Sequence, residues 1–207
     1  MANVAHSTLT GSNLHETKGM ASATDDYVLT ATSGAGVYKK LTAINLTGTG
    51  NPFGGQLFHI RDQKTSGTVG QTLTATSWNT RVLQTSVTNE ISSASLSSNQ
   101  ISLPAGTYFI MGDAVYGGVG GATNYGILRL RNITGSTTLV DGGTPGYYSI
   151  GSASNNLINN SIKGRFTLAG TTTIELQHYV SNAGTMQPLS ISSTPEVYAD
   201  ILIWKVG

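Results

Sequence analysis

The chain has 207 residues, of which 38% are hydrophobic and 10% are charged, and its formal net charge is +1. This balance excludes a sequence-independent nucleic-acid binder, which needs clustered lysine and arginine to displace counterions. The chain contains no cysteine, which excludes disulfides and thiolate metal sites. No run of about 18 or more apolar residues occurs, so we expect no insertion into a membrane.

The composition favours an all-β protein. Good helix formers such as Glu and Lys are few, whereas Thr, Val, Ile and Tyr are frequent and suit strands. The 26 Gly and five Pro stay below the level that marks low-complexity disorder, so a packed core is expected.

Residues 1–20 have no helical stripe, no strand alternation and few charges. Such an arm becomes ordered only by lying against a partner, to which it offers its backbone hydrogen-bonding groups. We predict an extended anchoring arm. Its candidate contacts are three apolar anchors and two histidines that can hydrogen-bond across the contact: Val4, Leu9, Leu14, His6 and His15.

Residues 21–55 contain a predicted β-hairpin followed by a hinge. Two short strands, Tyr27–Ala31 and Val37–Ile44, flank "TSGAG", whose glycines supply the positive φ of a tight turn. The stretch from Thr47 to Gly55 packs four Gly and one Pro into nine residues, which is typical of a hinge. The rest, residues 56–207, is predicted to be one domain.

From Gln56 onward, strand patterns recur between clusters of Gly, Asn, Pro and Ser. We expect eight to ten strands and no helix, which predicts a sandwich, a jelly roll or a barrel. The segments are "QLFHIRD", "TATSWNTRVLQTSV", "QISLP", "GTYFIMGDAVYG", "YGILRLRN", "TTLVDG", "SIKGRFTLAG", "TTTIELQHYVS" and "PEVYADILIWKV".

Two of these segments, Gly106–Gly117 and Glu196–Val206, are apolar on both faces. An antiparallel sandwich strand normally has one wet face, so we predict that the second face meets another copy of the chain. The sequence leaves open which face does so, and a thick monomer core covered by long loops is the alternative. The candidate interface residues are Tyr108, Ile110, Tyr116, Tyr198, Leu202 and Trp204.

Two long predicted loops, Asp141–Asn160 and Ser181–Thr194, are candidate ligand sites, because recognition often lies on long loops of a rigid scaffold. Tyr147 and Tyr148 offer flat faces to a sugar. Covering the sides or top of an oligomer is an equally good role for these loops.

No arrangement typical of catalysis or metal binding is present, so we predict no enzyme, no cofactor and no metal. The chain has no G-x-S-x-G motif. His59 and Asp62 should point to opposite faces of one strand, and no Glu or Asp lies at helical spacing from the leader histidines to complete a zinc site. His178 is expected to be a satisfied structural histidine, with Glu175 nearby and able to pair with Arg165.

The order of segments resembles a known family. "SLSSNQISLPAGTY", "EVYADILIWK" and the "ELQH" strand between them are similar to the C1q/TNF-like jelly-roll domains at the C-terminal ends of bacteriophage fibres, over Gln56–Val206. The leader "VAHSTLTGSNLHETKG" with "YVLTATSGAGVYKKL" resembles the amino-terminal segments of phage fibre and head-decoration proteins.

This resemblance implies a homotrimer that serves as a structural spike or receptor-contacting tip without catalytic activity. The expected function is a virion structural protein, a short head fibre or decoration assembled in the host cytoplasm and anchored to the capsid by its N-terminus. A role in attachment to a bacterial surface glycan is a further expectation. The alternatives are a tail-fibre or tail-spike adhesin, a glycan-degrading enzyme and a free soluble lectin.

Overall fold

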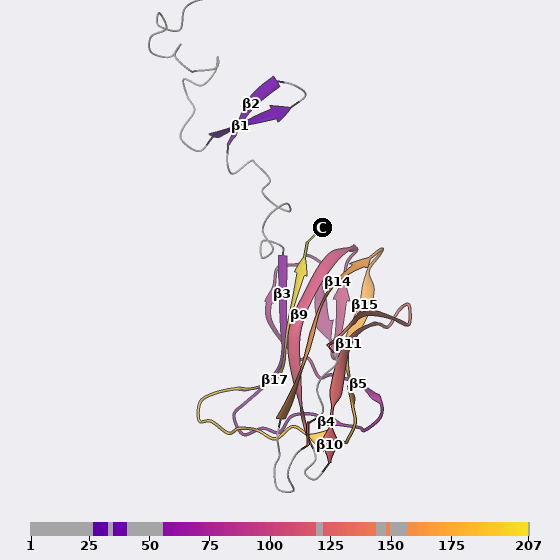
Figure 1. Ribbon diagram of the computed structural model, residues 1–207. Coiled ribbons are helices and arrows are strands. Elements are labelled where there is room, and N and C mark those ends of the chain that lie inside the picture. The colour runs from indigo at the N-terminus through magenta and orange to yellow at the C-terminus, as the bar shows by residue number, and fades with distance from the viewer. Residues whose placement is uncertain are drawn as a thin grey trace, which may run out of the picture. The chain divides into compact units, whose positions relative to one another are not determined.

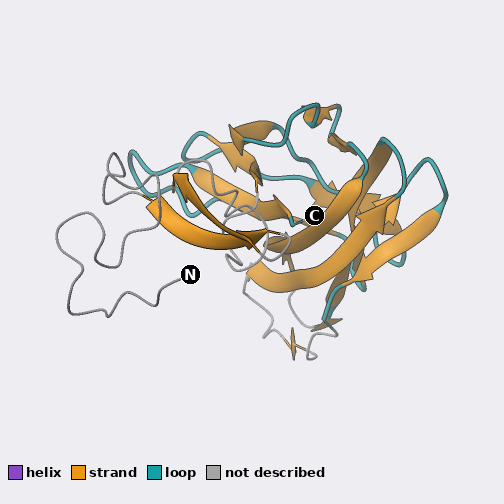
Figure 2. Ribbon diagram, turned by 90° about the horizontal axis from the view of Figure 1, so that it is seen from above, coloured by secondary structure: helices purple, strands orange, loops and turns teal. Residues whose placement is uncertain are grey.

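The computed structural model describes residues 27–32, 35–40, 56–118, 122–143, 148–149 and 157–206. The chain divides into two compact units, Met1–Thr49 and Gly50–Gly207 (Figure 1). Figure 2 shows strands and loops but no helix among the described residues. Accordingly, that part of the chain has no helix suited to crossing a membrane.

The first unit contains an antiparallel hairpin of β1 (Tyr27–Thr32) and β2 (Ala35–Lys40). The predicted hairpin is therefore confirmed. Its second strand starts at Ala35, two residues before the predicted start, and the predicted end at Ile44 lies outside the described residues.

The second unit consists of strands joined by turns and loops. They are β3 (Gln56–Lys64), β4 (Thr72–Leu73), β5 (Trp78–Thr80), β6 (Thr85–Asn89), β7 (Ser95–Ser97), β8 (Gln100–Leu103), β9 (Gly106–Gly117), β10 (Thr123–Asn124), β11 (Gly126–Asn132), β12 (Thr137–Asp141), β13 (Tyr148–Ser149), β14 (Leu157–Leu168), β15 (Thr172–Val180), β16 (Gly184–Thr185) and β17 (Glu196–Lys205).

Most of these strands form two antiparallel sheets. Sheet I has the order β14-β9-β17-β3-β6, and sheet II has the order β12-β11-β15-β8-β7, with β5 also pairing with β15. The short pairs β10-β13 and β16-β4 lie outside both sheets. Figure 1 shows β3, β17 and β9 side by side in sheet I.

The strand order is that of a jelly roll. Taking β3, β8, β9, β11, β12, β14, β15 and β17 as the eight principal strands, sheet I holds the first, eighth, third and sixth, and sheet II holds the second, seventh, fourth and fifth. Each connection thus either crosses from one sheet to the other or stays within its sheet, in the order that two interleaved Greek keys require. The predicted all-β jelly-roll sandwich is confirmed, and it agrees with the fold that the family resemblance implies.

The core lies between the two sheets because alternate side chains of each strand point inward. The main cluster joins fully buried residues of both sheets, including Phe58, Ile60, Tyr108, Ile110, Leu128, Leu130, Ile174, Leu176, Ile201 and Ile203. A second, smaller cluster comprises Leu73, Tyr116, Ile158, Val180, Met186 and Tyr198.

Candidate functional site

The outward face of sheet I is the candidate functional surface. Its side chains alternate with the buried ones of β3, β9 and β17, and the strand register places them in rows across the sheet. Three rows are Leu57–Trp204–Phe109, His59–Leu202–Met111 and Arg61–Asp200–Asp113. The face is therefore apolar at one end of the sheet and charged at the other.

The apolar end exposes large side chains. Phe109 is 37% exposed and Met111 is 42% exposed, although both lie in the middle of a strand flanked by β14 and β17. Trp204 is 6% exposed, and its ring centroid is 6.3 Å from that of Phe109. An aromatic and thioether surface on a rigid sheet is typical of a protein contact.

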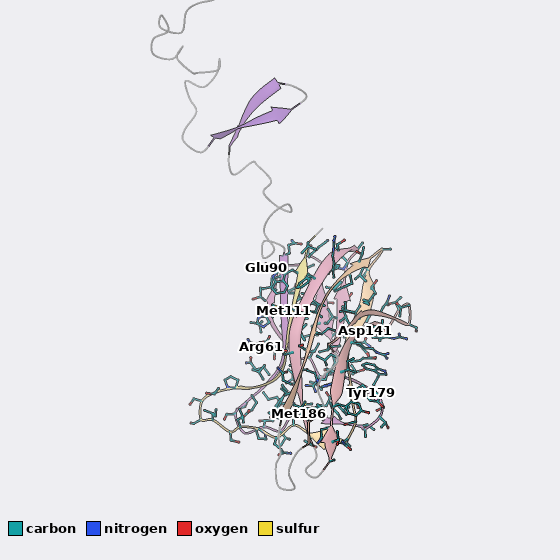
Figure 3. All side chains as sticks on the ribbon, in the orientation of Figure 1. Arg61, Glu90, Met111, Asp141, Tyr179 and Met186 are labelled. Atoms are coloured by element: carbon teal, nitrogen blue, oxygen red, sulfur yellow. The ribbon has the colours of Figure 1, made fainter. Side chains whose placement is uncertain are left out.

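The charged end is a linked cluster around Asp200. Its Oδ2 accepts hydrogen bonds from Arg61 Nε at 3.1 Å and Nη2 at 2.9 Å, and its Oδ1 lies 2.5 Å from His59 Nε2. Burial by itself would raise the pKa of Asp200, but the hydrogen bonds and positive charge of Arg61 and His59 outweigh it and lower that pKa. Asp200 is thus a fixed anion beside the apolar rows, and Figure 3 shows Arg61 and Met111 on the same side of the domain.

Four of the six predicted interface residues do not lie on this face. Tyr108 and Ile110 belong to the main core, and Tyr116 and Tyr198 belong to the smaller one. The subunit's own side chains cover them, which corrects the expectation that they contact a second copy. Leu202 and Trp204 do face outward, and their contact with another copy stays a prediction.

A β-bulge explains the misplacement of Tyr198. The register of β17 with β3 shifts between Val197 and Ala199, so Tyr198 has no partner residue on β3. Beyond a bulge, the inward and outward faces of a strand exchange. Strict alternation predicts that Tyr198 lies on the same face of the strand as Leu202 and Trp204. The extra residue of the bulge turns Tyr198 into the core instead.

A buried arginine supports this bulge. Arg81, fully buried between the sheets, donates from Nη2 to the carbonyl oxygen of Tyr198 and from Nη1 to that of Val115, both at 2.9 Å. Burial lowers its pKa to about 10, partly offset by the charge of Asp62. Asp62 is also fully buried, and neither of its carboxylate oxygens has a hydrogen-bond partner among the described residues.

His178 is a buried histidine packed against Tyr116 of the second cluster, and it is only partly satisfied, because its Nδ1 has no hydrogen-bond partner among the described residues. Asn160 donates from Nδ2 to the carbonyl of Gly126 at 2.8 Å, so its Oδ1 faces His178 Nε2, also at 2.8 Å. This amide orientation assigns the ring proton to Nε2. Burial, with a contribution from the charge of Arg81, lowers the pKa of His178 to about 3, so the ring stays neutral.

Several predicted residues fall partly or wholly outside the described residues. These include Val4, His6, Leu9, Leu14, His15 and Tyr147. The backbone of Tyr148 belongs to β13 and pairs with Asn124, but its side chain is outside the description. The roles predicted for all of them stay predictions.

The remaining sequence candidates are the acidic residues and histidines considered for ion pairs, catalysis or metal binding. His59 faces outward and Asp62 inward, on opposite faces of β3 as expected. Glu175 does not pair with Arg165, which lies in sheet I; its carboxylate instead accepts hydrogen bonds from Thr80, Gln100 and Gln177. Within the described part of the chain, no three or more His, Cys, Asp or Glu residues are grouped as metal ligands.

Phe109 and Met111 lie on one of the two apolar faces of Gly106–Gly117, but neither is among the candidate interface residues that the sequence predicts. The signal that could have done so is polarity in the neighbouring strands: His59 and Arg61 alternate with Phe58 and Ile60, which marks the outward side of β3. The sequence alone does not show that β3 pairs with β17, which places its outward residues beside Leu202 and Trp204.

No family model and no curated protein sequence matches the chain. Among solved structures, murine APRIL is 11% identical with a TM-score of 0.46, covering 72% of this chain and 98% of that one. The globular domain of zebrafish complement 1qA protein is 8% identical with a TM-score of 0.43, covering 74% and 98%. Eiger TNF from S. frugiperda is 13% identical with a TM-score of 0.46, covering 74% and 93%.

Proposed function

We propose that the chain is a non-enzymatic, homotrimeric structural protein of a bacteriophage particle, a short head fibre or decoration anchored by residues 1–20. The observation that carries self-association is the apolar end of sheet I, with Phe109 and Met111 exposed beside Trp204. The phage assignment rests on the sequence resemblance of the leader and of the C-terminal domain.

A second copy of the chain is the partner that fits this face best. The apolar rows offer Phe109 and Met111, and the adjoining strand β14 carries Lys163 and Arg165 in register with Met111 and Phe109. Asp113 is exposed on the same face and forms no ion pair among the described residues. Copies related by a rotation axis can bring the cations of one against the anion of the next around a shared apolar centre.

The arm fits the same proposal. Three copies present three arms, and tethering raises their effective concentration so that weak single contacts hold together. Val4, Leu9 and Leu14 are the apolar anchors, and His6 and His15 supply hydrogen bonds to the capsid surface.

Deleting residues 2–19 tests the anchor. The truncated protein should keep the wild-type oligomeric state in solution but be lost from purified particles in co-sedimentation. Normal occupancy of the truncated protein on particles would overturn the anchoring role.

Labelling intact particles separates the head from the tail. Immunogold label on heads supports the head fibre or decoration, whereas label only on tails replaces it with the alternative of a tail-fibre or tail-spike adhesin. Release of sugar from host capsule or lipopolysaccharide by the purified protein would instead favour a glycan-degrading enzyme.

A further inference from the structure

An aromatic patch lies on the outward face of sheet II. Trp78 of β5 and Tyr179 of β15 are partners in the strand register, with ring centroids 5.7 Å apart and planes inclined by 62°. Trp78 is 37% exposed. Figure 3 shows Tyr179 and Asp141 on the side of the domain opposite Met111 and Arg61, so this patch is separate from the candidate subunit interface.

A guanidinium group completes the patch. The Cζ atom of Arg129, on β11, lies 3.9 Å from the centroid of the Trp78 ring. Arg129 Nε donates to Gln177 Oε1 at 2.9 Å. Its two terminal nitrogens make no hydrogen bond or ion pair with the described residues.

A chain of hydrogen bonds on the same face of sheet II fixes the position of Arg129. Gln177 Nε2 donates to Glu175 Oε2 at 2.9 Å, which fixes the amide so that its oxygen faces Arg129. Glu175 in turn accepts from Thr80 Oγ1 at 2.7 Å and from Gln100 Nε2 at 2.9 Å. The patch is therefore supported by four strands, β5, β8, β11 and β15, and the forked end of Arg129 is preorganised without a hydrogen-bond partner among the described residues.

We propose that Trp78, Tyr179 and Arg129 bind a saccharide that carries a carboxylate group. The exposed ring of Trp78 and the half-buried ring of Tyr179 offer flat apolar surface for the C–H face of a sugar ring. The free terminal nitrogens of Arg129 match a carboxylate as a bidentate donor.

The surrounding charges fit a single carboxylate rather than a dense polyanion. Arg131 adds a positive charge on the same strand, two residues from Arg129. Asp141, the register partner of Arg129 on β12, and Glu175 offset it with two negative charges. A heavily sulfated chain would meet these acidic groups, whereas one carboxylate needs only the fork of Arg129.

Calorimetric titration of the purified full chain tests this site with matched pairs of probes. These are an oligogalacturonate against a neutral oligogalactoside of the same length, and sialyllactose against lactose. At least one acidic probe should bind about tenfold or more tightly than its neutral partner, because the neutral sugar leaves the guanidinium unpaired. Failure of both acidic probes to bind, or equal affinity within both pairs, would overturn the proposal.

Three variants locate the binding. Trp78→Phe retains an apolar ring and should lower the affinity for the acidic probe. Trp78→Ala should abolish binding of that probe. Arg129→Lys keeps the charge but loses the fork and should remove most of the preference for the acid. Arg131→Lys, on the same strand and face, is the matched control and should bind like wild type. Wild-type affinity for the acidic probe in both Trp78→Phe and Arg129→Lys would overturn the site, and lowered thermal midpoints in the same variants would show that the pair only stabilises the sheet.

The site does not depend on the proposed trimer or on the phage particle. Arg129→Lys should leave the oligomeric state unchanged, and substitutions at Met111 should leave the saccharide affinity unchanged. Failure of the saccharide site and failure of the proposed function therefore give separate results.

Discussion

At the residue scale, Gly126 is a position where a side chain has no room. A Cβ there would lie 2.6 Å from Asn160 Oδ1 and 2.8 Å from His178 Nε2. We expect Gly126→Ala to lower the free energy of unfolding by about 1–3 kcal/mol, because it forces this buried hydrogen-bonded pair apart. Gly170→Ala is the control, since no atom lies within 4 Å of its added Cβ. Urea unfolding measures both, and equal stability of the two variants would contradict the close packing around His178.

Arg81 is the second residue whose role can be measured. Arg81→Met leaves the carbonyls of Tyr198 and Val115 without their donor and removes the larger of the two positive charges that act on buried Asp62. Breaking such a pair costs about 3–5 kcal/mol. Adding Asp62→Asn should recover part of this loss, which a double-mutant cycle measures as a coupling free energy. Strictly additive effects would show that the two groups do not interact.

At the element scale, the start of β17 holds two loops together. The carboxylate of Glu196 accepts hydrogen bonds from the backbone N–H groups of Gly67 at 3.1 Å, Leu189 at 3.1 Å and Ser190 at 2.8 Å. The bond from Gly67 leads the effects on its pKa, and with the other two it lowers that pKa below the ordinary 4.5 despite the opposing effect of burial. Glu196 is therefore a latch between segments far apart in the sequence.

The latch predicts a pH dependence. Because the pKa of Glu196 is lower in the folded protein, its stabilisation is complete above about pH 4.5 and is lost as the pH falls through the folded value. Glu196→Gln should be less stable than wild type at neutral pH, with the difference shrinking toward acidic pH. Thermal midpoints measured from pH 7 to pH 3 report this difference, and a gap that stays constant with pH would count against the latch.

The element scale also shows what the sequence could and could not predict. Alternation and turn residues were enough for the hairpin and for an all-β sandwich, because these patterns are local. Two apolar faces in Gly106–Gly117 were also visible, but not which face enters the core. The placement of Tyr198 required the bulge against β3, and the Trp78–Arg129 contact required β5 and β11 to join β15. Both depend on pairings between distant segments, which no local pattern encodes.

At the scale of the whole molecule, the proposed trimer depends on the apolar end of sheet I. Burying a side chain such as Phe109 or Met111 from full exposure is worth about 1.5–3 kcal/mol. Since they are 37% and 42% exposed in the single chain, association can add only the part of this gain that belongs to the exposed surface. Repeated in every copy, this gain must exceed the loss of translational and rotational freedom on association. The strand setting of both residues favours it, because their backbone conformational entropy is already lost on folding.

A charge placed in that face should dissociate the assembly. Met111→Asp puts a carboxylate where another copy is expected, and we expect it to convert the protein to monomers at micromolar concentration without unfolding it. Leu189→Asp, at a loop residue that is 70% exposed, is the matched control and should assemble like wild type. Sedimentation velocity separates these outcomes, and normal assembly of Met111→Asp would place the contact on another surface.

The mass of the wild-type chain in solution is the decisive measurement for the trimer. Light scattering after size-exclusion chromatography at micromolar concentration should give three times the 21.5 kDa of one chain. A particle of 21.5 kDa that persists as the concentration is raised would contradict the shared apolar face and the trimer built on it.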